Sequence, residues 1–316
     1  MKFLSISPST NPKYFITHVR DKFDRYIKTL NFHGFEEITP ATEADFILLD
    51  NNYHESTIGT MRRAHADGKP VFKLPHGARA DLFWDFIFYN IAREEDVTFV
   101  FGPGQKKIYE KANYGTRIET IGFPWATIKP FQHKTGKRLL FAPIHGMEDS
   151  ENRIIVPLFK EWNRSIMDNL RQLKSDFDIV VYLSAEPEKI YVDPKEEGIE
   201  YIHSDLKLKT AIEQIDKSDF VLAHETFAHI AIARGVPTLM FDDHHIGWHG
   251  KNKKSKFWPH YHVTDRYPLN WLTAPNKHAL IEAAVKPNPH VDAWKEKYIG
   301  TDFDENRFIE IIEEYL

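Results

Sequence analysis

One stretch, DFVLAHETFAHIAIARGVPTLMFD at residues 219–242, constrains what this chain can fold into more than any other feature. A short apolar run over 219–223 is followed by three polar residues, a small-residue helix predicted over 227–234, a Gly-Val-Pro break and a second apolar run. Two buried strands joined through one helix form a βαβ unit, in which the strands run parallel. The pattern therefore predicts a parallel sheet.

The polar turn between the first strand and the helix is a candidate ligand site. At this position a helix presents unpaired N–H groups and the positive end of its dipole to the crevice, where anionic ligands bind. We expect His224, Glu225, Thr226 and Phe227 to face a nucleotide or a sugar phosphate. An alternative is purely structural, with Thr226 capping the helix and Glu225 complementing its dipole.

The rest of the chain reads as two successive cycles of strands and helices. The first cycle has strands predicted near 2–7, 35–38, 46–49, 69–74, 97–101 and 117–121, and helices over 14–32, 56–67, 80–92 and 105–112. Residues 126–136 lack periodicity and predict a linker. The second cycle adds strands near 138–142, 177–183, 199–203 and 261–264, and helices over 152–174, 206–217, 275–285 and 306–315.

Two such cycles predict an α/β fold of two Rossmann-like, doubly wound domains that face each other across a cleft. The expected N-terminal domain covers residues 1–125 and the expected C-terminal domain residues 137–300. We expect the helix within 301–316 to pack back on the N-terminal domain.

Composition narrows the class of protein. A length of 316 residues leaves room for two hydrophobic cores, and a net charge of -5 gives no overall attraction to nucleic acid or an anionic membrane. The absence of cysteine excludes disulfides, thiolate nucleophiles and Cys-ligated zinc. No run approaches the about 20 apolar residues that span a bilayer, and the apolar N-terminus is too short for a signal peptide. We therefore expect a cytoplasmic protein without a transmembrane segment.

Polar residues fall at the ends of several predicted strands. Ser7 and Ser9 belong to a Ser-Pro-Ser-Thr loop, and two His-Gly pairs follow later strands, at 76–77 and 145–146. Neutral imidazole can take a proton from an attacking hydroxyl because its pKa lies near neutrality, and glycine lets the backbone approach a ligand closely. His76 and His145 are thus candidates for one crevice between the domains. The alternative is a polar turn in which each histidine binds backbone.

The long connection FDDHHIGWHGKNKKSKFWPHYH, residues 241–262, is a second informative stretch. Its lysines, among them Lys251, Lys253 and Lys254, are interleaved with aromatic residues such as Trp258, a mixture that suits phosphate contact plus stacking. The acidic and histidine residues at 242–245 offer metal ligands as a less favoured interpretation. A solvated surface loop is the remaining alternative.

Three segments carry a resemblance to a known family: FKLPHGARADLF at 72–83, RLLFAPIHG at 138–146 and SDFVLAHETFAHIAIARGVPTLMFD at 218–242. They resemble the GT-B glycosyltransferases, most closely the CDP-glycerol glycerophosphotransferase and capsular-polysaccharide transferase group, and more distantly the UDP-N-acetylglucosamine 2-epimerases. The donor-site motif Asp-Tyr-Ser-Ser of that group is His-Glu-Thr-Phe here, and the arginine that follows its Ala-Pro-Thr is missing. These departures leave the donor open.

The resemblance implies roles for particular residues. His76 would be the base that activates an acceptor hydroxyl. Donor phosphates would be held by His145, Gly146 and Arg153, together with the turn at His224, Glu225, Thr226 and Phe227. From the residue types themselves, and not from the resemblance, we expect the acceptor to meet Ser7, Ser9, Lys251, Lys253, Lys254 and Trp258. The family generally works without a metal, so no metal site and no cofactor is expected beyond the nucleotide-activated donor, with UDP as one candidate carrier.

The resemblance thus implies an inverting, metal-independent transferase that moves a sugar or polyol-phosphate to an acceptor hydroxyl. The 1–125 domain would receive the acceptor and the 137–300 domain would hold the donor. The acceptor is either a surface polysaccharide or a hydroxylated DNA base, as in polysaccharide biosynthesis or DNA modification. A nucleotide-sugar 2-epimerase and a non-catalytic sugar-nucleotide-binding module remain as alternatives. The sequence leaves the oligomeric state open.

Overall fold

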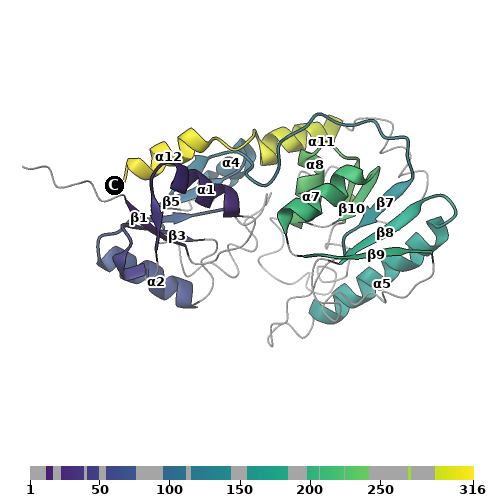
Figure 1. Cartoon of the computed structure of the whole chain (residues 1–316), viewed down its shortest axis with the longest axis horizontal. Helices are drawn as coiled ribbons and strands as arrows, with labels where there is room; N and C mark the ends of the chain where they lie inside the picture. Colours follow the sequence, from purple (N-terminus) through teal and green to yellow (C-terminus); the bar gives the residue numbers. More distant parts are fainter. Residues whose placement is uncertain are drawn as a thin grey trace, which may run out of the picture. The chain divides into compact units, whose positions relative to one another are not determined.

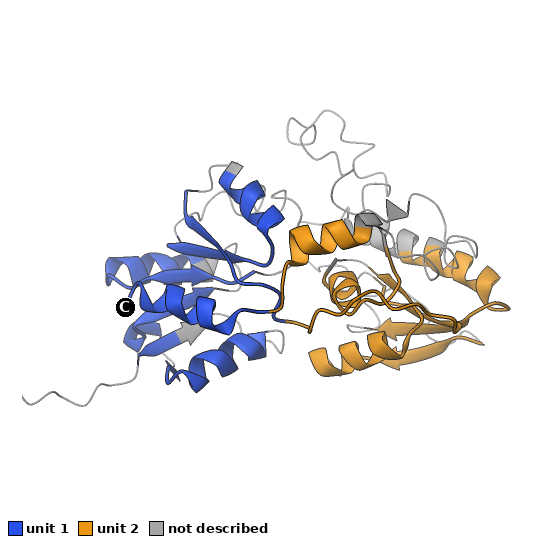
Figure 2. Ribbon diagram, turned by 90° about the horizontal axis from the view of Figure 1, so that it is seen from above, with its two compact units in different colours: residues 1–76, 82–124, 303–316 blue, residues 77–81, 125–302 orange. Residues whose placement is uncertain are grey.

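A computed structural model of the chain describes residues 12–16, 23–38, 41–49, 55–75, 95–111, 115–143, 155–183, 198–205, 207–223, 225–241, 270–271 and 289–316. These residues form two compact units (Figure 2). Unit 1 takes its described residues from the chain up to Pro124 and from Phe303–Leu316, and unit 2 takes them from Trp125–Asp302. No helix within the described ranges is long and apolar enough to cross a membrane.

Unit 1 contains, among its described residues, a parallel sheet of six strands in the order β2-β1-β3-β4-β5-β6. Strands β1, β3 and β5 of this sheet are labelled in Figure 1. The strands are β1 (Lys13–Ile16), β2 (Glu36–Glu37), β3 (Phe46–Leu49), β4 (Val71–Lys73), β5 (Val97–Val100) and β6 (Arg117–Thr120). Strands β3, β4 and β5 are buried along their whole length, as expected for a parallel sheet covered on both faces.

Helices cover both faces of this sheet. On one face α1 (Asp24–Phe32) and α12 (Glu305–Glu313) pack on Phe46, Phe72 and Phe99 in a single apolar cluster. On the other face α2 (Glu55–Ala66) packs on Ile47 and Val71. Helix α4 (Pro103–Lys111) lies against β5 and β6. Unit 1 is therefore doubly wound.

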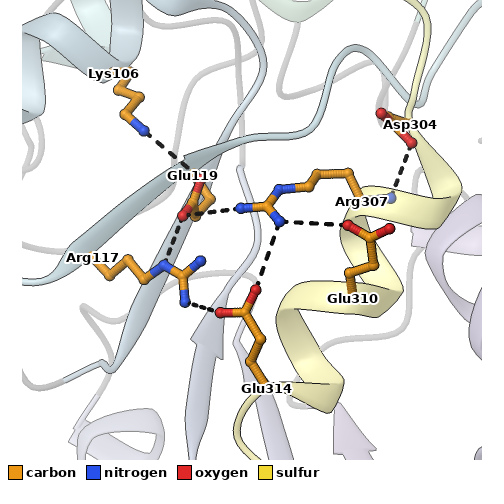
Figure 3. Close-up of polar contacts among 7 residues, drawn as sticks. All are labelled: Lys106, Arg117, Glu119, Asp304, Arg307, Glu310 and Glu314. Carbon is orange, nitrogen blue, oxygen red and sulfur yellow. Dashed lines mark hydrogen bonds and ion pairs between the residues drawn. The ribbon is translucent and has the colours of Figure 1, made fainter.

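Helix α12 joins unit 1 from the far end of the chain. Its apolar side packs beside α1, and its start is capped by Asp304, whose carboxylate accepts from the Arg307 N–H at 3.0 Å. Figure 3 shows the polar side, where Arg307 lies between Glu119 of β6 and Glu314, and Arg117 contacts both carboxylates. Phe308, Ile309, Ile311 and Ile312 of α12 are thus part of the core of unit 1.

Unit 2 contains a second parallel sheet, with six strands in the described residues and the order β12-β11-β10-β7-β8-β9. The strands are β7 (Arg138–Phe141), β8 (Asp178–Leu183), β9 (Glu200–His203), β10 (Phe220–Ala223), β11 (Thr238–Phe241) and β12 (Asn270–Trp271). Counted from β7, this is the strand order 3-2-1-4-5-6 of dinucleotide-binding Rossmann folds.

Helices also cover both faces of the second sheet (Figure 1). Helix α5 (Ile155–Leu173) packs with Phe141, Val181 and Leu222 on one face. Helices α7 (Leu208–Lys217) and α8 (Glu225–Ala233) contact each other and lie on the opposite face, against β7, β10 and β11. Helix α11 (Pro289–Trp294) continues into a π-helical turn, Lys295–Ile299, that contacts α8. The predicted pair of doubly wound, Rossmann-like domains is confirmed.

Two elements differ from the sequence prediction. The helix expected over 14–32 is wrong at its start, because Lys13–Ile16 forms β1 and the helix begins only at Asp24. Tyr14 is fully buried, and β1 pairs with both β2 and β3. The sixth strand of unit 2 is Asn270–Trp271, paired with β11, and the strand expected near 261–264 lies outside the described residues.

The segment predicted as a linker, 126–136, is tied to the end of α8. The Lys129 N–H donates to the Ala233 carbonyl at 2.7 Å, and the Gln132 N–H donates to the Gly235 carbonyl at 2.8 Å. Arg234 adds an ion pair with Asp216 of α7, and its hydrogen bond holds the pKa of that carboxyl below the usual value. This segment therefore packs as part of unit 2.

Candidate functional site

The strand order of unit 2 reverses between β7 and β10. Chain connections leave these two neighbouring strands in opposite directions, so a crevice opens outside their carboxyl ends, and open α/β sheets bind ligands there. The two strands are firmly paired: Phe220 to Leu222 align with Leu139 to Phe141, and the Ala142 N–H donates to the Leu222 carbonyl at 2.9 Å. We take this switch point as the candidate site.

Helix α8 begins directly beyond β10. Glu225 is its first residue, and Thr226 and Phe227 are half-buried in its first turn. Apart from the buried His229, the following residues of α8 are small or aliphatic, and Ala228, Ile230 and Ala231 are buried. This composition lets α8 lie close to the sheet and directs its unpaired N–H groups and positive dipole end toward the carboxyl edge of β10.

The ring of Phe227 contacts the ring of Tyr182 on β8. Their centroids are 5.3 Å apart and the planes are tilted by 41°. Tyr182 is 1% exposed, its hydroxyl lies 2.8 Å from the Ser204 hydroxyl just after β9, and burial raises its pKa. The pair thus links the start of α8 to the carboxyl ends of β8 and β9.

Small residues on the intervening strands make this contact possible. The strand registers place Ala223 of β10, Ala142 after β7 and Tyr182 of β8 in one row across the sheet. The residues before them, Leu222, Phe141 and Val181, face α5, so this row faces the side of α7 and α8. Phe227 therefore reaches from α8 across β7 at Ala142, beside the switch point.

The turn after β9 is ordered by a carboxylate. Asp205 accepts from the Lys207 N–H at 3.0 Å and from the Thr210 hydroxyl at 3.0 Å. The backbone hydrogen bond from Lys207 is the main cause of the lowered pKa of Asp205. Asp205 thus serves the start of α7, while its neighbour Ser204 turns to Tyr182.

Of the site residues expected from the sequence, Thr226 and Phe227 are described with their side chains and Glu225 with its backbone. The other candidates lie outside the described residues: Ser7, Ser9, His76, His145, Gly146, Arg153, His224, Lys251, Lys253, Lys254 and Trp258. The part of the chain that is described holds no group of three His, Asp or Glu residues able to bind a metal ion. The candidate residues that the structure describes are therefore those at the start of α8.

Two residues linked to Phe227, Tyr182 and Ser204, were not expected from the sequence to lie near the candidate site. Tyr182 lies within the apolar run Asp178–Leu183, and Ser204 follows an edge strand. The only signal in the sequence was a hydroxyl-bearing ring in a strand that is otherwise aliphatic. Such a ring usually finds a hydrogen-bond partner when it is buried, as Tyr182 does here.

Comparisons with known proteins bear on the fold. No protein-family model matches the chain, and no curated protein matches it. A solved structure of a putative UDP-N-acetylglucosamine 2-epimerase from Listeria monocytogenes is 15% identical, covers 96% of both chains and has a TM-score of 0.57. Arabidopsis thaliana UGT89C1 complexed with UDP is 14% identical over 92% of this chain and 76% of its own, with a TM-score of 0.49. An alpha-glucosyltransferase in complex with UDP and a 13-mer DNA containing a HMU base is 11% identical over 96% of this chain and 100% of its own, with a TM-score of 0.44.

At these identities the likeness concerns the fold alone. The first of these structures matches this chain over nearly its whole length. Together with the two parallel sheets and the strand order of unit 2, it shows a fold of the GT-B type, built from two Rossmann-like units.

Proposed function

We propose that this protein transfers a sugar or polyol-phosphate from a nucleotide-activated donor to an acceptor hydroxyl. The switch point of unit 2 carries the proposal, because both segments that leave it bear the expected donor residues. His145, Gly146 and Arg153 follow β7 in the chain, and His224, Glu225, Thr226 and Phe227 follow β10. Helix α8 would hold the diphosphate on its first N–H groups.

His76 is the proposed base. Its imidazole would take the proton of the acceptor hydroxyl while the oxygen forms a bond to the donor carbon or phosphorus from the side opposite the leaving group. The bond from that atom to the nucleotide breaks, and the nucleotide leaves with the electron pair. The N–H groups of α8, with His145 and Arg153, would stabilise the negative charge on the leaving phosphate. This route needs no metal ion, and it inverts the configuration at the carbon or phosphorus that is attacked.

The experiment replaces His76 by Ala and measures transfer and donor binding separately. Transfer should be lost while the shift in melting temperature caused by the nucleotide is kept, because donor binding is assigned to the other domain. His33→Ala, at an exposed position of unit 1, is the matched control and should retain transfer. Turnover that survives in His76→Ala would remove His76 from the mechanism.

The acceptor is proposed to be either a surface polysaccharide or a hydroxylated base in DNA. Lys251, Lys253 and Lys254 would contact the backbone if the acceptor is DNA, with Ser7, Ser9 and Trp258 nearer the reacting hydroxyl. Replacing the three lysines by Gln should then flatten the salt dependence of DNA binding. Replacing the exposed Lys28, Lys209 and Lys217 removes the same charge and should leave the salt dependence steep. DNA binding that is weak and insensitive to both variants would favour the polysaccharide.

A nucleotide-sugar 2-epimerase is the second candidate. It is favoured by the match in fold to a structure described as a putative UDP-N-acetylglucosamine 2-epimerase. An epimerase needs no acceptor, so incubation with UDP-N-acetylglucosamine alone separates the two reactions. Conversion to a second UDP-sugar in that incubation would replace transfer as the proposed function. Nucleotide binding without turnover across a panel of donors and acceptors would instead indicate a non-catalytic binding module.

A further inference from the structure

We propose that Phe227, held against Tyr182, is a specificity-determining residue that packs on a ring of the donor. The inference rests on the proposed function, because it concerns the donor site at the switch point of unit 2. It goes further by assigning an apolar contact, next to the phosphate site, to one side chain. The ligand chemistry is a flat ring face, supplied by either the base or the sugar of a nucleotide-activated donor.

The ring of Phe227 lies beside the switch point of unit 2. Phe227 lies in the first turn of α8, directly after the strand at the switch point. Its contact with Tyr182 carries it over β7, the other strand at the switch point, because β7 lies between β10 and β8. A ligand that binds at the switch point against the start of α8 would therefore meet this ring.

The contact with Tyr182 holds the ring of Phe227 in one orientation. Tyr182 is buried, and its hydroxyl is held by Ser204, so the surface on which Phe227 leans is rigid. The small side chains of Ala142 and Ala223 leave space for the ring of Phe227 on the sheet, and both alanines are almost fully buried. Phe227 itself is only half-buried, so the residue keeps some surface that a ligand could contact. A rigid aromatic ring loses little entropy when a ligand ring packs on it.

The start of α8 and the ring of Phe227 favour different chemical groups. The helix start favours negative charge, whereas an aromatic face next to it favours uncharged, flat groups. A nucleotide-activated donor combines a diphosphate with a base on one side and a sugar on the other. The two neighbouring surfaces would therefore recognise two different parts of the same molecule. Inorganic pyrophosphate offers only the first part.

The experiment titrates UDP, CDP, ADP, GDP, UDP-glucose and pyrophosphate into the wild type and into Phe227→Ala, Phe227→Leu and Phe227→Tyr by calorimetry. The Ala variant loses the stacking of a ligand ring on an aromatic side chain, so we expect it to bind the tightest-bound nucleotide about tenfold more weakly than the wild type. Leu keeps apolar volume without a ring and should weaken binding similarly. Phe227→Tyr keeps an aromatic ring, so its nucleotide affinity should lie within about threefold of that of the wild type. Pyrophosphate should bind all four proteins equally.

The ligands distinguish which ring is involved. Weaker binding of the nucleoside diphosphates assigns the base, and weaker binding confined to UDP-glucose assigns the sugar. Equal loss for pyrophosphate, or full recovery with Leu, would show that Phe227 only supports the fold of α8 and would overturn the inference. So would wild-type affinities in all variants. If the wild type binds no nucleotide, the proposed function fails, and the inference fails with it.

Discussion

Arg117 on β6 pairs with Glu314 at the end of α12, 197 residues further along the chain. The same guanidinium contacts Glu119, and Arg307 of α12 reaches both carboxylates (Figure 3). At the other end of α12, Arg25 of α1 pairs with Glu305 at 3.2 Å. The helix is thus held to unit 1 by charged contacts at both ends and by its apolar side between them.

Replacing Glu314 by Gln should lower the melting temperature at pH 7, and the difference from the wild type should disappear in acid. The hydrogen bond from Arg117 lowers the pKa of Glu314 from its usual 4.5 in the folded protein. A carboxyl with a lowered folded pKa stabilises the fold above its unfolded pKa, and this contribution is lost as the pH falls through the folded value. Glu313→Gln, at the exposed neighbouring position, is the matched control, because it removes the same charge and leaves the Arg117–Glu314 pair intact. A pH-independent difference for Glu314→Gln would contradict the assignment.

Replacing Gly235 by Ala should be the more damaging of two similar substitutions in unit 2. Gly235 has φ 73°, and a Cβ there would lie 2.0 Å from the Pro130 carbonyl oxygen. Gly198 has φ 77°, but among the described residues its Cβ would meet only the end of the Lys174 side chain, at 3.1 Å. The left-handed conformation alone costs about 1–2 kcal/mol for a residue with a Cβ, so Gly198→Ala should lose about that much unfolding free energy. Gly235→Ala should lose clearly more, because backbone must move. Equal losses in urea unfolding would show that the contact with Pro130 does not matter.

The predictable part of the fold is the part with buried strands. Strands β3, β5, β8 and β10 are short apolar runs because both faces of a parallel sheet are covered, and such runs are visible in a sequence. The small residues of α8 and the polar turn before it likewise predicted the βαβ unit that the structure shows as β10, α8 and β11. In contrast, the spacing of aromatic residues in 14–32 suits a helix, although Lys13–Ile16 pairs as a strand. Tertiary pairing overrides local periodicity there.

Contacts between distant strands were not predictable. Along the chain, the described elements β9, α7 and β10 lie between Tyr182 and Phe227, and the strand order brings the two residues together. Strand β12 has two residues, too few to form a sequence pattern. The buried pair of Lys73 and Glu95 was also missed, because a lysine in a short strand normally indicates an exposed position.

Replacing Tyr26 by Phe should leave unit 1 as stable as the wild type, or more stable. Tyr26 is fully buried between Phe303 and Phe308, its hydroxyl has no hydrogen-bond partner among the described residues, and burial raises its pKa well above the usual value. Removing an unsatisfied buried hydroxyl recovers up to about 1–3 kcal/mol. Tyr14→Phe is the matched control. It removes a hydroxyl that donates to Asn31 at 3.2 Å, and it should lose about 0.5–1.5 kcal/mol of unfolding free energy. A loss of similar size for Tyr26→Phe would indicate a partner for its hydroxyl.

Replacing Lys73 and Glu95 together should cost less than replacing either one. The Lys73 ammonium lies 3.9 Å from the Glu95 carboxylate, which also accepts from the Thr98 hydroxyl at 2.9 Å, and both charged residues are buried in unit 1. Lys73→Met or Glu95→Leu leaves one buried charge without its counter-charge, which typically costs about 3–5 kcal/mol. The double variant buries no unpaired charge at this position. Its unfolding free energy should therefore lie above that of both single variants. If the two losses simply add, the pair is not coupled, and the polar groups around each residue compensate its charge independently.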